Sequence, residues 1–500
     1  MKTYLAFDAG TMGTKTALYD LSGRLLAESY WENPIAFPRP GWAQLDVMTF
    51  LENFRHGAAE CLAASGVNGQ TVAAVTGSGI ICGVVGVDGA FNPVTPFIPY
   101  LDNRAAPLAA QMRQTCPPYW QEECGCAQLD EFLPPVVARW LLNSPDGDKI
   151  HKIVNNGPFV LSRLAGLSAR DAFIDWATLS GWMAGYDVRT QDWSARQLEG
   201  LNLPRRYLPQ IVEPWKVVGG LCEAEASALG LKPGIPVVAG AGDVMQAILG
   251  AGAVSPGDGV DIAGTASIFA LSVQEPLGPV SARPGFYYAM GTERDSSFYW
   301  TMIRAGGLSL RWFRDQICCK SQDRAFYSRM DDAAAQTPEG SDGVLFYPYI
   351  QGAGPDLPGA SGVFLGLHGS SGRPLLWRSI LEGIAFEYRK VVDFYRSCGL
   401  PVLRVVGTEG GSRSDLWSQI KSDMLACPYV RLSRPSGGLM ANAALAAFGC
   451  GDLSSLRGTL SGWNAPRDAV TPREDVSNLY SRRSAERRKI LAHLSHIWAL

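Results

Sequence analysis

The chain has 500 residues, of which 47% are hydrophobic and 18% are charged, with a net charge of −3 and a sequence pI of about 6.0. This balance is typical of a globular enzyme of roughly two to four domains, and it excludes the basic surface that a nucleic-acid or anionic-membrane partner would need. The sequence contains no run of about 18 apolar residues, so no membrane span is predicted. A strand pattern begins at the N-terminus, and no signal peptide is predicted ahead of it.

The N-terminal segment predicts a mixed α/β domain, because short apolar strands alternate with an amphipathic helix. The helix is expected at 47–65, where apolar residues recur at helical spacing. The predicted strands are 3–8, 15–20, 24–31, 72–76 and 83–87. The first three lie close enough in sequence to form an antiparallel meander.

The remainder of the chain is richer in predicted helices. A buried strand at 236–240 precedes a helix at 244–251, and a strand at 402–406 runs into a glycine loop. Further helices are predicted at 300–319, 374–398, 415–425, 439–448 and 478–499. The last helix has a basic cluster that we expect to be a solvated face, formed by Arg482, Arg483, Arg487 and Arg488.

Cysteine usage indicates a reducing compartment. The 11 cysteines are irregularly spaced, and the close pairs Cys124/Cys126 and Cys318/Cys319 lack the partners of a zinc site. We therefore expect a cytoplasmic protein with reduced thiols.

A strand-turn-strand pattern occurs twice in the chain. The first copy contains Phe7-Asp8-Ala9-Gly10-Thr11 and the second contains Asp261-Ile262-Ala263-Gly264-Thr265. A Gly-Thr turn between two strands exposes backbone N–H groups and a hydroxyl, and such a turn can hold a phosphate. One copy in each half predicts two related domains that grip one nucleotide, whereas an ordinary hairpin turn is the structural alternative.

Asp8 and Lys15 give the first copy its chemistry. Asp8 ends a predicted buried strand, where a carboxylate is costly unless it is solvated, hydrogen-bonded or near a cation. A Mg²⁺ ion bridged to phosphates would supply that cation, and Lys15 on the returning strand can point toward a phosphate. The segment is not a P-loop, because that motif needs Gly-Lys-Ser/Thr at the start of a helix. A turn-capping acid is the alternative interpretation of Asp8.

Asp243 has a similar setting. The apolar strand delivers it at its carboxyl end, Gly240 and Gly242 leave room around it, and a helix starts directly after it. Ligands of α/β folds gather at the carboxyl ends of strands, and an acid there can act as a general base toward a hydroxyl. A helix N-cap is the structural alternative.

Two further segments contain candidate binding residues. The loop with Gly410 and Gly411 lies between a strand and a helix, and its small residues would let a flat base approach the backbone. Asp102 and Arg104 form a compact acid–base pair that could bracket the hydroxyls of a polyhydroxylated ligand. An ordinary strand–helix turn and a surface salt bridge are the respective alternatives.

Together these segments resemble the FGGY family of carbohydrate kinases, within the actin-like ATPase superfamily, over essentially the whole chain. The matching segments, in order, are Asp8-Ala9-Gly10-Thr11 with Lys15, Leu101-Asp102-Asn103-Arg104, Ala239-Gly240-Ala241-Gly242-Asp243, Ala263-Gly264-Thr265-Ala266-Ser267, the run Gly410–Asp423, and Ala441-Asn442-Ala443-Ala444. Each motif is weak by itself, but their order along the chain makes the resemblance specific.

The resemblance implies an α/β protein with two ribonuclease H-like (actin-like ATPase) domains and an interdomain cleft that holds ATP and sugar. An N-terminal domain at 1–250 would bind sugar and contain the first phosphate motif and the base, and a C-terminal domain at 251–500 would contain the second phosphate motif and the adenosine site. The implied cofactors are ATP and Mg²⁺. The implied roles are catalytic base for Asp243; metal binding for Asp8 and Asp243; ATP binding for Thr11, Lys15, Gly264, Thr265, Gly410, Gly411 and Asn442; and substrate binding for Asp102, Arg104, Cys82 and Asp243.

The sequence also departs from the family pattern. The xylulokinase-like stretch Gly-Gln-Met-His-Gly reads Gly79-Ile80-Ile81-Cys82-Gly83, which removes two hydrogen-bond partners of the sugar and places Cys82 in that loop. Val137 replaces a lysine three residues before Trp140, and Glu409 replaces the first glycine of the adenosine loop. A standard D-xylulose site is therefore in doubt, although Asp102 and Arg104 still favour a polyol or a ketose.

We expect an ATP-dependent kinase that phosphorylates a terminal hydroxyl of a small sugar or polyol, with a pentulose such as xylulose as the first candidate. Another ketose, a polyol or a related acid remains open as the acceptor, and a homodimer remains open as the assembly. An actin-like nucleotide-switch protein without catalysis is the alternative from another class, but it predicts neither a base at a small-molecule pocket nor the pair of Asp102 and Arg104.

Overall fold

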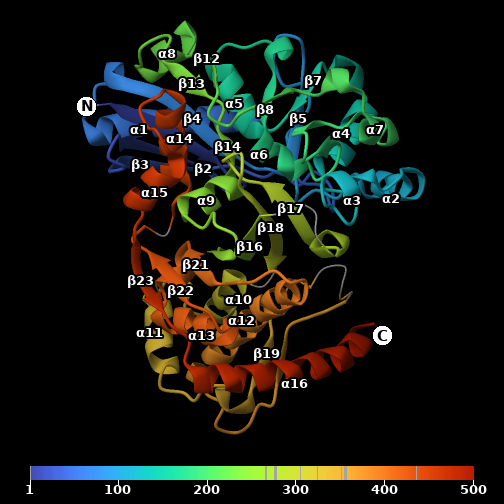
Figure 1. The fold of residues 1–500 in the computed structure, drawn as a ribbon, viewed down its shortest axis with the longest axis vertical. Helices are drawn as coiled ribbons and strands as arrows, with labels where there is room; N and C mark the ends of the chain where they lie inside the picture. The colour runs from blue at the N-terminus through green and yellow to red at the C-terminus, as the bar shows by residue number, and fades with distance from the viewer. Residues whose placement is uncertain are drawn as a thin grey trace. The chain divides into compact units, whose positions relative to one another are not determined.

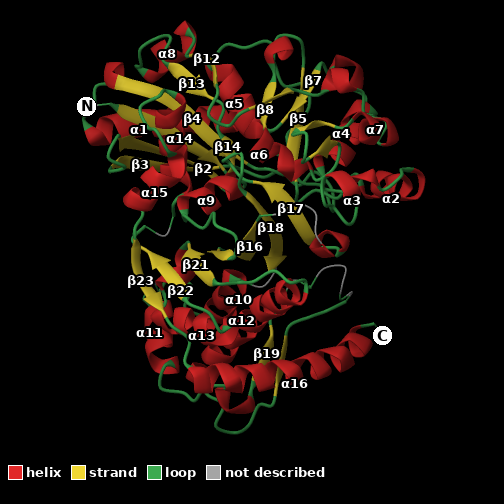
Figure 2. Ribbon diagram, in the orientation of Figure 1, coloured by secondary structure: helices red, strands yellow, loops and turns green. Residues whose placement is uncertain are grey.

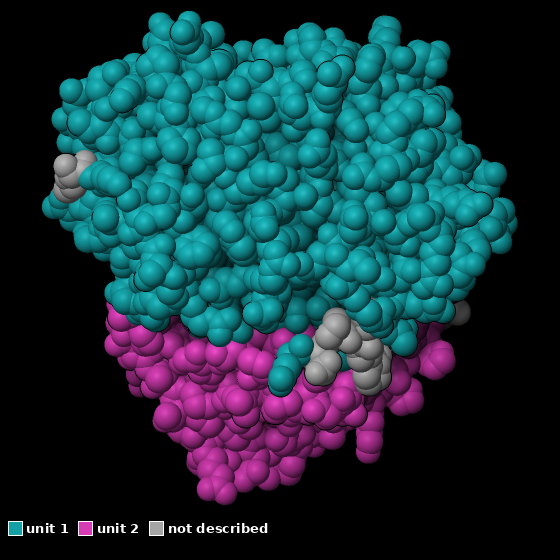
Figure 3. Space-filling view, turned by 45° about the horizontal axis from the view of Figure 1, so that its top comes forward, with its two compact units in different colours: residues 1–254, 274–299, 437–464 teal, residues 255–273, 300–436, 465–500 magenta. Residues whose placement is uncertain are grey.

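The computed structural model describes residues 2–264, 267–274, 279–303, 306–323, 325–350, 352–353, 357, 359–434 and 436–499. The chain divides into two compact units, which Figure 3 colours separately. Unit 1 comprises 1–254, 274–299 and 437–464, and unit 2 comprises 255–273, 300–436 and 465–500. The units therefore interleave along the sequence, and a domain division after residue 250 stays a prediction.

Unit 1 is a mixed α/β structure (Figures 1 and 2). Its strands are β1 (Thr3–Ala9), β2 (Gly13–Asp20), β3 (Leu25–Glu32), β4 (Val72–Gly79), β5 (Gly83–Val87), β6 (Ile98–Pro99), β7 (Lys152–Val154), β8 (Phe173–Asp175), β9 (Tyr186–Asp187), β10 (Asp192–Trp193), β11 (Gln210–Val212), β12 (Val217–Gly220), β13 (Pro236–Val238), β14 (Ala241–Gly242) and β17 (Phe286–Met290). Its helices are α1 (Val47–Ser65), α2 (Ala106–Thr115), α3 (Tyr119–Glu123), α4 (Pro134–Leu142), α5 (Asn156–Leu164), α6 (Trp176–Leu179), α7 (Ala195–Gly200), α8 (Glu223–Leu229), α9 (Asp243–Gly250), α14 (Gly438–Gly449) and α15 (Leu456–Trp463).

The main sheet of unit 1 has β1 at its centre. The strand order is β12-β13-β4-β1-β2-β3, and β14 also pairs with β4. β1 is parallel to β4 and antiparallel to β2. Leu5 and Phe7 of β1 belong to one hydrophobic core, which includes residues of α1, whereas Tyr4 and Ala6 belong to a second core with α14. Because side chains alternate along a strand, Asp8 lies on the side of the sheet that α14 covers.

Unit 2 is also mixed α/β. Its strands are β15 (Asp258–Ala263), β16 (Ser267–Val273), β19 (Leu345–Tyr347), β20 (Val363–Leu365), β21 (Arg404–Thr408), β22 (Tyr429–Leu432) and β23 (Pro466–Val470), and β18 (Ser297–Ile303) crosses the unit boundary. Its helices are α10 (Gly307–Trp312), α11 (Phe326–Ala334), α12 (Arg373–Ser397), α13 (Asp415–Leu425) and α16 (Glu474–Trp498), with a π-helix at Phe313–Ile317.

The sheet of unit 2 repeats the central arrangement of unit 1. Its strands include the order β16-β15-β21-β22-β23, with β15 antiparallel to β16 and parallel to β21. In the same way β1 is antiparallel to β2 and parallel to β4. The two sequence repeats are therefore hairpins in equivalent positions, closed by the pairs Ala9↔Thr14 and Ala263↔Ser267.

The predicted elements near the motifs are confirmed, but the helix predicted at 300–319 is wrong in its first part, since only Gly307–Ile317 is helical. The strand β18 continues to Ile303, and α10 begins only at Gly307. The segment Ser297–Ile303 is rich in aromatic and β-branched residues, which favour a strand. An apolar run of this kind also fits one face of a helix, which is why the pattern predicts a helix there.

The basic cluster of α16 is not a single solvated face. Arg487 is buried, and its guanidinium carbon lies 3.9 Å from the ring centroid of Tyr347 and 5.1 Å from that of Phe386. Tyr480, Ser484 and Arg487 are all buried, at the i, i+4, i+7 spacing of one helix face. The arginine therefore contributes to the core of unit 2 through its contacts with aromatic rings.

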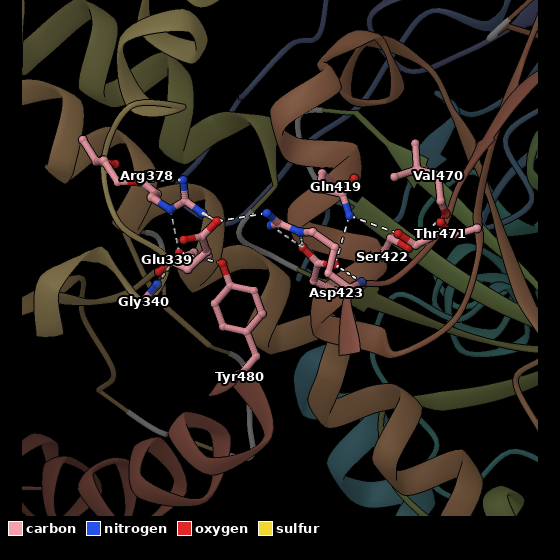
Figure 4. A network of polar contacts seen from close by, with 12 residues as sticks. Glu339, Gly340, Arg378, Gln419, Ser422, Asp423, Val470, Thr471 and Tyr480 are labelled. Carbon is pink, nitrogen blue, oxygen red and sulfur yellow. Dashed lines mark hydrogen bonds and ion pairs between the residues drawn. The ribbon is translucent and has the colours of Figure 1, made fainter. Parts of the chain in front are cut away.

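Polar side chains fix the helices of unit 2 to one another (Figure 4). Arg378 and Tyr480 both donate to Glu382 Oε1, at 2.9 and 2.7 Å. Arg473 pairs with the buried Asp423, at 2.7 Å between Nη2 and Oδ2. These contacts join α12, α13 and α16, with Asp423 in the last turn of α13.

Two negative findings apply to the part of the chain that the structure describes. None of its helices combines the length and apolar character needed to cross a bilayer. All 11 cysteines are free thiols rather than disulfides.

Candidate active site

Three strands of unit 1 bring polar residues to one edge of the sheet. Asp8 of β1 is in register with Ser78 of β4, and Ser78 is in register with Ala241 of β14. Asp243 directly follows β14 and is the first residue of α9. Because these strands are parallel, Asp8, Ser78 and Asp243 meet at their carboxyl ends, where α/β folds bind ligands.

The two glycines before Asp243 are required by the local backbone. Gly240 has φ +77°, and a Cβ atom there would lie 1.9 Å from the carbonyl oxygen of Gly77. A Cβ atom at Gly242 would lie 2.2 Å from Ile81 Cγ2. Glycine therefore allows the chain to approach β4 closely enough to deliver Asp243 to the sheet edge.

The environment of Asp243 suits a general base. Burial raises the pKa of its carboxyl to about 7, and the charge of Asp8 acts in the same direction. The backbone N–H of Val244 donates to Asp243 Oδ1 at 2.8 Å and partly opposes these effects. A carboxyl with a pKa near neutrality can both accept and release a proton at physiological pH.

A chain of hydrogen bonds orients Asp8. The Asn442 side-chain amide donates to Ser78 Oγ at 2.9 Å, and Ser78 Oγ donates to Asp8 Oδ1 at 2.9 Å. Asn442 is fully buried in α14 of unit 1 and also donates to the Phe7 carbonyl at 2.9 Å. Sequence reasoning assigned Asn442 to ATP and missed Ser78, whose signal was a serine at the end of a buried strand. In the structure Asn442 supports Asp8 indirectly, through Ser78. A contact of Asn442 with adenosine stays a prediction.

The predicted phosphate ligands of unit 1 lie around the first turn. Lys15 is directly opposite Asp8 in the β1–β2 register. Thr11 is half-buried in the turn and lies within hydrogen-bond reach of the Tyr100 phenol. Burial raises the pKa of Tyr100, the hydrogen bond with Thr11 opposes this shift, and the negative charge of Asp243 adds to it. Sequence reasoning missed Tyr100, although an aromatic residue two positions before Asp102 was a visible signal.

Cys82 belongs to the same neighbourhood. Its thiol is buried and donates to the Gly181 carbonyl at 3.3 Å. Burial raises the pKa of this thiol, followed by the effects of Asp243 and Cys126. Cys82 is therefore a neutral, weakly polar group near the candidate base.

Asp102 and Arg104 form a buried pair rather than a surface salt bridge. Arg104 Nε donates to both Asp102 oxygens at 2.9 Å, and the side chains are 2% and 1% exposed. Asp102 also accepts the backbone N–H of Ala43 at 2.6 Å and that of Arg104 at 2.9 Å. The carboxylate thus receives bonds from two segments of unit 1 and fixes them together.

The Arg104 guanidinium is held on several sides. It lies 4.0 Å from the ring centroid of Trp42 and 5.2 Å from that of Trp140. Its Nη2 donates to Gln44 Oε1 at 3.0 Å. These contacts fix the guanidinium in place, and a direct contact of Asp102 or Arg104 with substrate stays a prediction.

The predicted nucleotide residues of unit 2 gather at the second turn and the glycine loop. Gly264 accepts the backbone N–H of Gly307 at 2.9 Å, whereas Thr265 lies outside the described residues. A Cβ atom at Gly411 would lie 2.4 Å from Ala263 Cβ, but one at Gly410 would meet no atom within 4 Å. Gly411 is therefore needed for packing, whereas Gly410 adjoins open space.

Glu409 occupies a backbone conformation that favours glycine. It has φ 60° and ψ −163°, a region that residues with side chains adopt at a cost of about 1–3 kcal/mol. Its carboxylate accepts a hydrogen bond from Ser436 at 2.9 Å. The departure from the family glycine therefore leaves strain at the start of the loop.

The acid of the second repeat is part of a buried polar cluster. Asp261 pairs with Lys421, and both side chains are fully buried. The hydroxyls of Tyr388 and Tyr429 donate to the same carboxylate, the latter at 2.7 Å. Lys421 Nζ lies 3.8 Å from the ring centroid of Trp417. Burial lowers the pKa of Lys421, and Asp261 opposes that shift.

The acidic residues of unit 1 suit a magnesium ion that takes most of its ligands from water and phosphate. They do not suit a metal ion that is enclosed by protein ligands. Within the described residues, no group of three or more His, Cys, Asp or Glu side chains could hold a metal ion. Two carboxylates whose charges interact, Asp8 and Asp243, match the preference of Mg²⁺ for one or two carboxylates with the remaining ligands from water and phosphate.

Family models match most of the chain. Residues 3–250 match the N-terminal domain, and residues 260–450 the C-terminal domain, of the FGGY family of carbohydrate kinases. The xylulose kinase of Bacillus subtilis is 24% identical over 91% of this chain and 90% of its own. The gluconokinase of Bacillus subtilis is 24% identical over 85% of this chain and 83% of its own.

A solved structure shows the same fold. The structure of Plasmodium falciparum glycerol kinase with ADP aligns with a TM-score of 0.85 at 18% identity, over 99% of this chain and 98% of that one. Family domains of both kinds match this chain in order, and its fold is the two-domain actin-like ATPase fold of such kinases. The protein therefore belongs to the FGGY family of carbohydrate kinases and is an enzyme of that class.

Proposed function

We propose that the protein transfers the γ-phosphoryl group of ATP to a terminal hydroxyl of a small sugar or polyol, with Asp243 as the general base and a pentulose such as xylulose as the first acceptor to test. The observation on which this proposal depends is the pairing of Asp243 with Asp8 at one sheet edge, where the pKa of Asp243 is raised to about 7. Glycerol kinases, gluconokinases and xylulose kinases are all relatives, so the acceptor is a separate question.

Each residue of unit 1 has a distinct part in this proposal. Asp243 accepts the proton of the attacking hydroxyl, for which a pKa near 7 is well matched. Asp8, oriented by Ser78, would hold the metal ion, and Lys15 and Thr11 would bind phosphate oxygens. When bound, Mg²⁺ neutralises charge that develops on the phosphates during transfer. Phosphoryl transfer depends mainly on such positioning and charge neutralisation.

The glycines of unit 2 supply the remaining part of the nucleotide site in this proposal. Gly264 and Thr265 would bind phosphate, and Gly410 and Gly411 would line the adenosine pocket. The open space at Gly410 supports this assignment, since a base could approach the backbone there. In this proposal the strained backbone of Glu409 lies at the start of the nucleotide loop.

The remaining parts of the proposal concern the setting of the enzyme. We propose a cytoplasmic kinase of N-terminal domain 1–250 and C-terminal domain 251–500, with Mg²⁺ as the cofactor and no nucleic-acid or membrane partner. The net charge of −3 and the free thiols support this setting. A homodimer is the assembly to test.

A coupled assay of ADP release tests the function. The enzyme is incubated with ATP and Mg²⁺ over a panel of ketoses, polyols and sugar acids. We expect at least one neutral acceptor to raise turnover well above the background hydrolysis of ATP. If no compound does so, the kinase proposal is wrong.

The Asp243→Asn variant tests the base. General-base catalysis contributes a factor of about 10²–10⁴ to the reaction rate. We therefore expect kcat to fall by a factor in this range or larger, while ATP binding is retained. The exposed Asp148→Asn, in the same unit, is the matched control and should leave kcat unchanged. A near-normal kcat of Asp243→Asn would refute the assignment.

A further inference from the structure

The turn of the first repeat is held by a buried asparagine that has no role in the mechanism above. Asn33 directly follows β3 and is 4% exposed. Its side-chain amide donates to the Gly10 carbonyl at 2.7 Å, and its backbone N–H donates to the Met12 carbonyl at 3.0 Å. Its Oδ1 accepts the Thr14 hydroxyl at 3.2 Å. Asn33 therefore contacts the start, the middle and the end of the turn that joins β1 to β2.

Helix α1 fixes the orientation of Asn33. The buried Asn53 of α1 donates to Asn33 Oδ1 at 2.7 Å and to the Glu32 carbonyl at 2.9 Å. The two lone pairs of Asn33 Oδ1 are thus used by Thr14 and Asn53. Because the oxygen is held on this side, the amide nitrogen of Asn33 is directed at Gly10.

The turn uses its carbonyl groups inside the protein and leaves N–H groups available. The Gly13 carbonyl accepts the Gly10 N–H at 3.1 Å, and the Met12 carbonyl accepts the Tyr30 hydroxyl at 3.1 Å in addition to the Asn33 N–H. In the described part of the chain, the backbone N–H groups of Thr11 and Met12 donate to no protein acceptor. A turn that presents free N–H groups in this way is suited to an anion.

The strand that enters the turn is held in a similar way. Asn156 of α5 donates to the Ala9 carbonyl at 2.8 Å, and Asn442 of α14 donates to the Phe7 carbonyl at 2.9 Å. Both asparagines are fully buried. The backbone is therefore fixed on either side of Asp8, and Asn33 extends this support into the turn itself.

We propose that Asn33, fixed by Asn53, is a positioning residue for the nucleotide phosphates. It keeps the turn in the conformation whose Thr11 and Met12 N–H groups donate to a phosphate oxygen of ATP. This inference rests on the proposed kinase function, which assigns phosphate to this turn. Since the turn is ordered before ATP binds, less of the binding free energy is lost in ordering it. Loss of Asn33 should weaken the binding of nucleotide phosphates and leave the binding of adenosine unchanged.

The Asn33→Ala variant tests this role. It removes the side-chain bonds to Gly10 and Thr14 but keeps the backbone bond to Met12. We expect the Kd for ATP with Mg²⁺, measured by isothermal titration calorimetry, to rise about tenfold, because hydrogen bonds that order the turn are lost. The KM for ATP should rise with it, whereas the KM for the sugar acceptor should not change.

Adenosine separates positioning from a merely structural role. Adenosine has no phosphate, so its inhibition constant against ATP should be the same in Asn33→Ala and in the wild type. An equal loss of affinity for ATP and adenosine would overturn the proposal, and so would an unchanged Kd for ATP. Asn143→Ala, which removes an exposed asparagine of the same unit, is the matched control and should change neither value.

Tyr30→Phe is a second variant for the same turn. It removes only the hydroxyl that donates to the Met12 carbonyl and keeps the ring that covers Gly13, where a Cβ atom would lie 2.3 Å from Tyr30 Cε2. Tyr30 is 52% exposed, so the variant should fold. We expect the Kd for ATP to rise about two- to fivefold, with no change for adenosine. If Asn33→Ala does not fold, an unchanged ratio of the two affinities in Tyr30→Phe overturns the proposal.

The outcomes separate the two proposals. A wild-type enzyme that phosphorylates an acceptor, beside an Asn33→Ala variant with normal ATP affinity, overturns the role of Asn33 and leaves the kinase function intact. A wild-type enzyme that phosphorylates no acceptor overturns the kinase function itself.

Discussion

The strands of the two strand-turn-strand repeats pair in the same way but place their acids on opposite sides of the strand. When the Ala-Gly-Thr turns are aligned, Asp8 corresponds to Ile262, and Asp261 corresponds to Phe7. Asp8 lies at the sheet edge with the candidate base, whereas Asp261 is fully buried against Lys421. A shift of one residue along a strand moves a side chain to the other face.

The comparison shows that similar motifs can have unlike purposes. In unit 1 the core position is filled by Phe7, which packs against Phe54 with ring centroids 5.0 Å apart. In unit 2 the equivalent position is an acid that is neutralised by Lys421 and two tyrosine hydroxyls. The acid of the first repeat is therefore available for catalysis, whereas the acid of the second repeat stabilises the fold.

The largest expected effect is on the stability of unit 2. Lys421→Met leaves Asp261 buried without its cation, and breaking a buried ion pair costs about 3–5 kcal/mol. We expect urea unfolding, followed by tryptophan fluorescence, to shift to lower concentration by that free energy. The double variant Lys421→Met/Asp261→Asn should recover part of the loss. Equal midpoints for wild type and Lys421→Met would mean that Asp261 is not committed to the fold.

Asp8→Asn should show the opposite behaviour. Removing one preorganised electrostatic group at an active site costs about 10²–10³-fold in kcat, so we expect a fall of that size. Stability should be equal or higher, because the repulsion between Asp8 and Asp243 is relieved. The check is steady-state turnover beside thermal unfolding. Loss of stability without loss of turnover would remove the contrast between the repeats.

The pH dependence sharpens the role of the two acids. The pKa of Asp243 is raised to about 7 from the usual 3.8, so kcat/KM should fall tenfold per pH unit below about pH 7 as the base is protonated. The same shift makes folding less favourable as pH rises from about 4 to 7, because the unfolded chain ionises first. In Asp8→Asn the acidic limb of the residual activity should move to lower pH. An unmoved limb would show that the two carboxyls are not coupled.

The smallest effect concerns the strained residue of unit 2. Glu409→Gly should raise the free energy of unfolding by about 1 kcal/mol, because glycine adopts this backbone conformation without strain. Ser436→Ala is the control for the hydrogen bond that the glutamate side chain loses. Differential scanning calorimetry of both variants is the measurement. A lower melting temperature for Glu409→Gly would show that its side chain contributes more than its backbone costs.

Local patterns predicted most of the fold near the motifs. The helix at 415–425 has the predicted bounds, and its Ser414 side chain caps the N-terminus as such residues do. The helix at 47–65 is likewise as predicted, with Asp46 as its cap. The error at 300–319 arose because an apolar, aromatic run fits a buried strand as well as a helix, and only pairing with other strands decides between them.

The site was less predictable because its contacts join segments that are distant in sequence. Asp8 and Asp243 could be singled out by their places at strand ends, but their electrostatic coupling depends on how β1, β4 and β14 pair. The Asn442–Ser78–Asp8 chain joins three such segments. The spacing of Asp102 and Arg104 allowed a salt bridge, but no local signal indicated that this pair would be buried inside unit 1.

The place of α14 in unit 1 has a consequence for biosynthesis. This helix packs against β1 and β4, yet it is encoded near the end of the chain, after most of unit 2. A nascent chain that has emerged from the ribosome only as far as residue 436 would expose the sheet face that includes Tyr4, Ala6 and Ala74. The strand that bears Asp8 is thus covered on both faces only after α14 has been synthesised, so that a product truncated before residue 438 would leave this face uncovered and would lack Asn442 beside Ser78.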